Sequence, residues 1–491
     1  MPISETQFIL DPAARGTLQR QIQTMVATGI LAGRFRPGDR LPSSRRLAQH
    51  LGVSRITVTL AYTELVSSDY LSARGRSGYF VSDTAPGPPA LRPQAVPAPS
   101  SIDWGARIGT RFSDADRLEK PADWRDFSYP FIYGQADPDL FDHSNWRLCA
   151  VQALGQSAFD ALTSDQYDRD DPELVEFIAR HSLPRRGILA RPDEILVTMG
   201  AQNALWLAAQ VLLGQGGKAV MEDPGYPGLR EILGQCAGKM VTVQVDSGGL
   251  PPQAIARGTD VIFTTPSHQC PTAATMPVAR RRALLARAAE IGAVIVEDDY
   301  EFETSFLSAP SPALRALDRD GRVIYVGSFS KALFPGLRLG YLVGPAPVIR
   351  EARALRATVL RHPPGHLQRT AAQFLSLGHY DAQLRRMSTV LRRRRAVMEQ
   401  AIARHGLTIA GRDSLGGSSL WMTAPEGCDT AELAARLRRD GVLIEPGAVF
   451  FAGPERPHHF YRLAYSSIPE PRIEPGIARI ATALSESATP G

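Results

Sequence analysis

A lysine, two serines and an arginine lie close together in the stretch "SFSKALFPGLRLGY", residues 328–341. A neutral amine such as that of Lys331 can form a Schiff base with an aldehyde. The hydroxyls of Ser328 and Ser330 and the forked guanidinium of Arg338 are donors suited to a phosphate group. The stretch therefore predicts a site for a phosphorylated aldehyde, and pyridoxal phosphate is a cofactor that carries both groups.

Two other segments carry side chains suited to the ring of this cofactor. In "VEDDYE", Asp298 ends an apolar run, and a carboxylate against the pyridine nitrogen keeps that nitrogen protonated. Tyr300 can then form a hydrogen bond with the phenolic oxygen of the ring. In "EDPGYPG", the aromatic ring of Tyr226 can stack on the flat cofactor.

A second phosphate cradle is predicted in "TMGAQNAL". There Gly200, Ala201 and Gln202 present backbone amides at the start of a helix. Each of these segments is weak alone. Their order along the chain and their joint chemistry are what favour a cofactor site.

The segments that carry these residues alternate between apolar strands and helices after residue 195. Such alternation is typical of an α/β domain with a largely parallel sheet. The predicted strands are "EILVTMG", "KAVMED", "MVTVQV", "DVIFTT", "AVIVEDD", "RVIYVGS" and "LRLGYLVG".

A proline-rich segment, "DTAPGPPALRPQAVPAPSS" at residues 83–101, marks the clearest boundary. Its prolines cannot continue a helix or a central strand, and the composition favours a stiff spacer. A chain of 491 residues is also too long for one ordinary core. We predict an N-terminal domain at 1–82, a linker at 83–126 and a large domain at 127–491, with a small α+β subdomain from about residue 370.

The N-terminal domain has the pattern of a winged helix-turn-helix. Three helices are predicted, with Ser43 and Ser54 as N-caps and Gly52 as a helix stop. "YLSARGRSGYFV" reads as strand, glycine turn and strand, which makes a wing. The start of a third helix suits the major groove, and arginines can bind guanine edges or phosphates. The alternative is a small protein-interaction domain with solvated arginines.

The stretch "PGDRLPSSRRLAQHLGVSRITVTLAYTELVSSDYL" resembles the GntR-type winged helix along its whole length. The resemblance implies contact with operator DNA through this domain, including the wing around Gly75. The predicted DNA-binding residues are Arg45, Ser54, Arg55, Thr57, Thr59 and Arg76.

The large domain, from about residue 127 to 487, resembles a fold-type I, aspartate-aminotransferase-like domain. A GntR winged helix joined to such a domain is similar to the MocR family of bacterial transcription regulators. "TTPSHQCPTAATMP", "EDDYE" and "SFSKALFPGLRLGY" stand in that family's order.

The resemblance implies that Lys331 holds the cofactor as an internal aldimine. Tyr167 would reach the phosphate site of a dimer partner, Arg462 would clamp a carboxylate, and His268 would lie near the cofactor. The other implied cofactor contacts are Gly200, Ala201, Gln202, Tyr226, Asp298, Tyr300, Ser328, Ser330 and Arg338.

Two segments depart from the pattern of related aminotransferases. Where those enzymes carry N-P-T-G, this chain has "CPTA", so Cys270 replaces an asparagine and Ala273 a glycine. A thiol cannot reproduce the asparagine's hydrogen bond, and the alanine predicts a different loop. In "YDRDDPELVEF", Asp170 or Asp171 stands near a usual glycine and Val175 replaces a usual arginine, which affects the placement of Tyr167.

The resemblance implies a regulator that senses an amino compound by external aldimine formation, in a head-to-tail homodimer. An aminotransferase with an accessory DNA-binding domain, or a regulator that senses pyridoxal phosphate itself, stays open. Taurine-, 4-aminobutyrate-, diamine- and D-amino-acid-like effectors are all compatible. Glu445 is expected to be structural, with contact to an effector amine as the alternative.

Composition adds weaker limits. No stretch of eighteen apolar residues exists, so no membrane span is predicted. Four scattered cysteines without metal spacing indicate a reduced, cytoplasmic compartment and no metal site. Net charge is only +5, and the basic runs "ARRRALLARAAE" and "LRRRRAVMEQ" are expected to be solvated helix faces.

Overall fold

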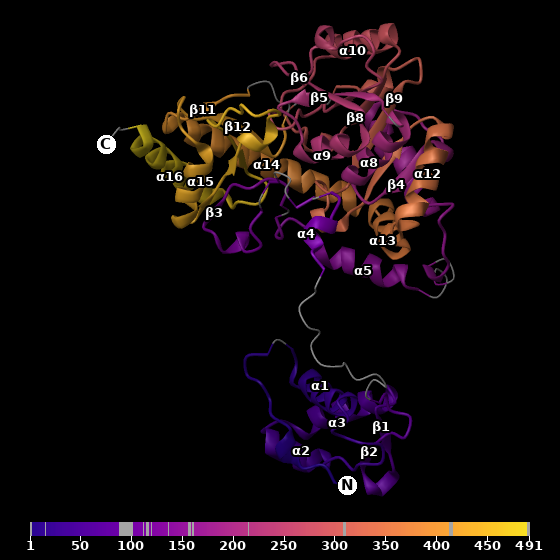
Figure 1. Cartoon of the computed structure of the whole chain (residues 1–491). Helices are drawn as coiled ribbons and strands as arrows, with labels where there is room; N and C mark the ends of the chain where they lie inside the picture. The colour runs from indigo at the N-terminus through magenta and orange to yellow at the C-terminus, as the bar shows by residue number, and fades with distance from the viewer. Residues whose placement is uncertain are drawn as a thin grey trace. The chain divides into compact units, whose positions relative to one another are not determined.

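The computed structural model describes residues 2–14, 16–87, 102–110, 112–113, 117–118, 120–135, 137–155, 159, 162–214, 216–307, 311–411 and 416–488. It forms two compact units, Met1–Arg111 and Phe112–Gly491 (Figure 1). Most of the proline-rich segment, residues 88–101, lies outside the described residues. The domain boundaries at 82 and 126 stay predictions.

The N-terminal unit is a winged helix-turn-helix, as predicted. The Ser43 hydroxyl accepts a hydrogen bond from the Arg46 amide, and the Ser54 hydroxyl accepts one from the Thr57 amide. Gly52 adopts a left-handed conformation (φ 66°) that ends α2. The elements are α1 (Leu18–Leu31), α2 (Ser44–Leu51), α3 (Arg55–Ser67), and the antiparallel wing strands β1 (Leu71–Ala73) and β2 (Tyr79–Val81).

The core of the C-terminal unit is a seven-stranded sheet in the order β4-β10-β9-β8-β7-β5-β6. Only β10 runs antiparallel to its neighbours, which confirms the largely parallel sheet. The strands are β4 (Ile195–Thr198), β5 (Lys218–Asp223), β6 (Lys239–Gln244), β7 (Val261–Thr264), β8 (Val294–Asp298), β9 (Val323–Ser328) and β10 (Gly340–Val343).

Helices cover both faces of this sheet (Figure 1). Alternate residues point to opposite faces, so Val296 and Val326 pack with α8, α9 and α12, while Ile295 and Tyr325 face the other way. The longer helices are α5 (His143–Ala153), α7 (Pro172–Phe177), α8 (Ala201–Leu213), α9 (Pro227–Cys236), α10 (Val278–Ile291), α12 (Ala346–Leu360) and α13 (Gly365–Ser376).

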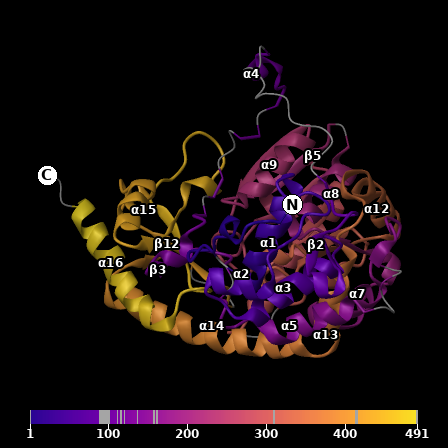
Figure 2. The ribbon, with the colours of Figure 1, turned by 90° about the horizontal axis from the view of Figure 1, so that it is seen from below.

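The last part of the chain builds a smaller sheet in the order β11-β12-β15-β14. The long helix α14 (orange) connects the two parts, and α16 (yellow) packs against it (Figure 2). A segment from the start of the unit completes this part, since β3 pairs in parallel with β13. The elements are β3 (Tyr129–Pro130), α14 (His379–Arg404), β11 (Thr408–Ile409), β12 (Ser419–Thr423), α15 (Thr430–Arg439), β13 (Val442–Leu443), β14 (Glu445–Pro446), β15 (Phe460–Ala464) and α16 (Glu470–Ala488). The short helices are α4 (Trp104–Arg107) and α11 (Leu314–Leu317).

The expectation that both basic runs are solvated is partly wrong. Arg281 of α10 is buried, 3.6 Å from the carboxylate of Glu297. Arg394 and Arg395 of α14 are also buried, and Arg394 binds the carboxylate of Asp137. Arg281 and Arg394 thus lie beside buried carboxylates, whereas Arg395 binds the partly exposed Glu399. Among the described residues, none of the helices combines the length and apolar character needed to cross a bilayer.

Candidate functional site

The candidate cofactor residues converge at the carboxyl ends of the parallel strands. Asp298 ends β8, Ser328 ends β9, Gly200 follows β4 and Tyr226 follows β5. Because parallel strands end at one edge of a sheet, this is where α/β folds bind ligands. Lys331 lies in the turn just after β9, at the same edge.

The amine of Lys331 lies against the Tyr133 ring, with Nζ 3.8 Å from the ring centroid. Burial lowers the pKa of Lys331 to about 7. Glu301 opposes this shift, and the cations of Lys120 and Arg462 add to it. A large share of the lysine is therefore neutral, and so nucleophilic, near neutral pH.

We expect the rate at which Lys331 is labelled by a small aldehyde to level off above about pH 8. Since the neutral amine reacts, a pKa near 7 makes about a tenth of it reactive at pH 6 and about nine tenths at pH 8. Mass spectrometry after borohydride trapping measures this rate. A rate that still rises about tenfold from pH 8 to pH 9, as for an ordinary lysine, would contradict the prediction.

Asp298 is buried, and its Oδ1 has no hydrogen-bond partner among the described residues. Burial, together with the charges of Asp299 and Glu222, raises the pKa of Asp298 to about 8. A buried carboxylate oxygen without a partner is costly unless a donor meets it. A protonated ring nitrogen is such a donor, so this residue fits the pyridine ring of the predicted cofactor.

The predicted phosphate residues also come together. Gly200 has φ 80°, and a Cβ there would lie 3.1 Å from the guanidinium of Arg338. Position 200 therefore needs glycine, next to the first amides of α8 at Ala201 and Gln202. The buried Ser330 hydroxyl has no partner among the described residues. Ser328 is buried beside it, and its hydroxyl accepts a hydrogen bond from the Ser330 amide, 3.2 Å away.

The two tyrosines predicted to contact the cofactor ring lie in one cluster, but the hydroxyl of Tyr300 already has a hydrogen-bond partner. Tyr300 and Tyr226 both pack on the cluster around buried Cys270. The Tyr300 hydroxyl donates to the His268 carbonyl over 2.9 Å. Its predicted bond to the ring oxygen requires this hydroxyl to change partner. The imidazole of His268 is itself buried, and neither ring nitrogen has a partner among the described residues.

The "CPTA" loop keeps a left-handed turn. Ala273 adopts φ 60°, a conformation that favours glycine and costs alanine about 1–2 kcal/mol. The alanine therefore does not remove the positive φ from this position. Burial raises the pKa of Cys270 to about 12, so its thiol is neutral at physiological pH.

Arg462 is fully enclosed by the site. Its Nε donates to Glu445 over 2.8 Å, and its guanidinium lies 4.1 Å from the centroid of the Tyr133 ring. Glu445 is thus the structural partner of the arginine, as expected. The amines of Lys120 and Lys331 both lie next to Gly134. A Cβ at this glycine would be 3.4 Å from the amine of Lys120 and 2.6 Å from that of Lys331.

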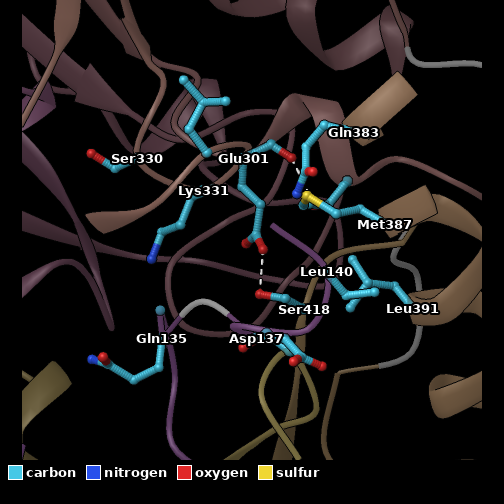
Figure 3. A pocket seen from close by; sticks show the side chains of 14 residues that line it. Gln135, Asp137, Leu140, Glu301, Ser330, Lys331, Gln383, Met387, Leu391 and Ser418 are labelled. Carbon is cyan, nitrogen blue, oxygen red and sulfur yellow. Dashed lines mark hydrogen bonds between the residues drawn. The ribbon is translucent and has the colours of Figure 1, made fainter. Parts of the chain in front are cut away.

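A pocket opens beside Lys331, between the two parts of the C-terminal unit (Figure 3). The Glu301 carboxylate accepts hydrogen bonds from the Ser418 and Tyr133 hydroxyls. Tyr133, Glu301 and Lys120 were not among the site residues predicted from the sequence. Only Glu301 carried a signal, because it directly follows Tyr300.

Tyr167 is not among the residues that line the site of its own chain. This residue is 52% exposed, in the loop before α7. The substituted positions after it are structural. Asp170 is buried between Arg353 and Arg356, and Val175 packs in the core.

The predicted DNA contacts lie on α2, α3 and the wing. Arg45 and Arg55 are exposed, and Thr57 and Thr59 are partly exposed on the first turns of α3. Ser54 caps α3. The side chain of Arg76 lies outside the described residues.

Comparisons with known proteins agree with both units. Residues 146–480 match the family "Aminotransferase class I and II", and residues 18–81 match "Bacterial regulatory proteins, gntR family". The HTH-type transcriptional regulator TauR of Rhodobacter capsulatus is 59% identical over 99% of this chain and 100% of its own length. The probable rhizopine catabolism regulatory protein MocR of Rhizobium meliloti is 32% identical over 97% of this chain and 96% of its own.

The structure of LysN, an α-aminoadipate aminotransferase from Thermus thermophilus, is also similar. It shows a TM-score of 0.69 and 28% identity, and the match covers 78% of this chain and 99% of LysN. The C-terminal unit thus has an aminotransferase fold, while the full-length relatives are regulators. The chain belongs to the MocR family of transcription regulators, in which a GntR-type winged helix is joined to an aminotransferase-like domain.

Proposed function

We propose that this regulator binds operator DNA in the cytoplasm and senses an amino compound through pyridoxal phosphate. One observation supports the sensing step above all others. Lys331, with a pKa near 7, and buried Asp298, whose Oδ1 has no hydrogen-bond partner among the described residues, lie together at the edge of an aminotransferase-like sheet. The similar enzyme LysN was solved with N-(5'-phosphopyridoxyl)-L-leucine.

In this proposal, different residues of the site bind the aldehyde, the ring and the phosphate of the cofactor. Lys331 binds the cofactor covalently, Asp298 faces its ring nitrogen, and Tyr226 stacks on the ring. The phosphate is held by Gly200, Ala201, Gln202, Ser328, Ser330 and Arg338. When bound, pyridoxal phosphate supplies an aldehyde that an effector amine can take over from Lys331.

The acidic group of the effector would bind Arg462. Within the described residues, Glu445 accepts a hydrogen bond from the Nε of this arginine. The terminal amino groups of the guanidinium can then bind a carboxylate or sulfonate. The rings of Tyr133 and Phe450 hold the guanidinium in place. Release of Lys331 upon effector binding would shift the C-terminal unit between two states and so change operator binding.

We also propose a homodimer, with Tyr167 contributing to the partner's phosphate site. Helix α5 leaves Leu148 and Val151 more than half exposed, which is typical of a protein interface. Light scattering on the purified chain tests this proposal. A monomer at micromolar concentration would contradict it.

Arg55→Ala should weaken operator binding by about 1–3 kcal/mol, because an arginine at the start of a recognition helix can bind a guanine edge. Duplexes selected by the wild-type protein from random DNA provide the probe. The matched control is Arg257→Ala, which removes one exposed arginine from the other unit and should leave affinity nearly unchanged. Cofactor loading should be intact in both variants, and its loss together with DNA binding would indicate misfolding.

An aminotransferase with an accessory DNA-binding domain is the second candidate. It is favoured by the near-neutral pKa of Lys331, which suits a general base. Cys270 disfavours it, because a neutral buried thiol does not replace the asparagine of related enzymes. Sustained formation of pyridoxamine phosphate from amines and its reconversion by keto acids would establish this function instead.

A further inference from the structure

Two large apolar side chains of α3 are exposed to solvent. Ile56 is 70% exposed and Leu60 is 50% exposed. Residues four apart lie one turn apart on the same face of a helix. The opposite face is buried through Val58, Tyr62 and Leu65. Helix α3 is thus apolar on its free face as well as in the core, whereas a merely solvated face would carry charges.

The two threonines on this face are also poor hydrogen-bond donors. The Thr59 hydroxyl donates to the Arg55 carbonyl and the Thr63 hydroxyl to the Thr59 carbonyl, both over 2.9 Å. Their hydrogens are therefore used within the helix. Ile56, Thr59, Leu60 and Thr63 form what we call the α3 stripe, an uncharged surface between the charged residues Arg55 and Glu64.

We propose that the α3 stripe reads thymine methyl groups in the major groove of the operator. This inference rests on the proposed function, in which α3 is the helix that reads DNA. In the major groove the methyl group of thymine is the apolar feature, while the other base edges offer hydrogen-bond donors and acceptors. Side chains that lack free donors discriminate these edges poorly, but they pack well on a methyl group.

The spacing of the stripe sets where the thymines lie. Ile56 and Leu60 are four residues apart, about 6 Å along the helix axis, and base pairs are about 3.4 Å apart. Their thymines should therefore be one or two base pairs apart, next to the base or phosphate that Arg55 contacts. The operator should contain a short A·T segment in each half-site.

The test replaces individual thymines by deoxyuracil, which removes only the methyl group. Duplexes are first selected by the wild-type protein from random DNA. Each uracil substitution under the stripe should then weaken binding about fourfold, the value expected for one buried methyl group. Ile56→Ser should abolish the uracil effect at its own thymine and preserve it at that of Leu60, whereas Ile56→Val should preserve both.

Several results would overturn the inference. Equal affinity for thymine and uracil duplexes at every position would do so, as would a uracil effect that is the same in wild type, Ile56→Ser and Leu60→Ser. An Ile56→Ser variant with a changed oligomeric mass but unchanged DNA binding would show that another protein chain covers the stripe. Because Ile56 is exposed, Ile56→Ser should unfold at the wild-type temperature. If the wild-type protein enriches no DNA at all, the proposed function itself fails.

Discussion

Lys331→Ala should abolish covalent attachment of pyridoxal phosphate. The expected loss is complete, because the chain has only four lysines: Lys120, Lys218, Lys239 and Lys331. Lys218 and Lys239 stand at the first residues of β5 and β6, away from the edge where the site lies. Borohydride treatment and peptide mapping should therefore place the pyridoxyl group on one peptide of the wild-type protein and on none of the variant.

Lys120→Ala is the matched control, because it removes the other lysine near the site. It should keep the pyridoxyl group on Lys331. The amine of Lys331 is buried and only partly charged, so its removal should not unfold the chain. Lys331→Ala should therefore still bind the duplexes that the wild-type protein selects. A tag on Lys120 in the wild-type protein, or a tag that persists in Lys331→Ala, would refute the assignment.

Arg186→Met should lower the free energy of unfolding of the C-terminal unit by about 3–5 kcal/mol. Arg186 and Asp299 are both fully buried and form an ion pair at 2.6 Å. The arginine also donates to the Ser311 carbonyl and the Ser267 hydroxyl. Loss of the guanidinium leaves the Asp299 charge in the core beside two neutral donors, the hydroxyls of Tyr325 and Ser267.

The neighbouring residue provides the control. Arg185 pairs with Asp381 at the surface, where both side chains are about 40% exposed, so Arg185→Met should cost no more than about 1 kcal/mol. Urea unfolding followed by tryptophan fluorescence measures both, since Trp124, Trp146, Trp206 and Trp421 lie in the C-terminal unit. Equal midpoints for the two variants would show that the buried pair does not stabilise this unit.

Most of the helices and strands, and the segments that meet at the candidate site, could be predicted from the sequence because those signals are local. Helix caps such as Ser54, and the apolar runs that become β8 and β9, depend on neighbouring residues only. Asp298 and Lys331 could be placed at one edge because parallel strands fix where their ends lie. The position of Tyr133 could not be predicted in this way, because its contact with Lys331 joins segments almost two hundred residues apart.

The wrong prediction for the basic runs had a different origin. Arg281 shares its helix face with Leu284 and Ala288, three and seven residues later, and all three are buried. Arg394 and Arg395 likewise fall between buried Leu391 and Met398. Helical spacing alone predicts a buried position for these arginines. Arginine as a residue type favours a solvated position, but the helical spacing favours a buried one, and a buried carboxylate can accommodate the charge.

The pairing of β3 with β13 sets the order in which the two units can mature on the ribosome. The winged helix is complete once its wing has emerged, but β3 cannot pair until β13 has been made, 313 residues later (Tyr129 to Val442). At about 5–20 residues per second, that delay is roughly fifteen seconds to a minute. During this interval a nascent chain already carries the folded winged helix while its aminotransferase-like unit is still being synthesised.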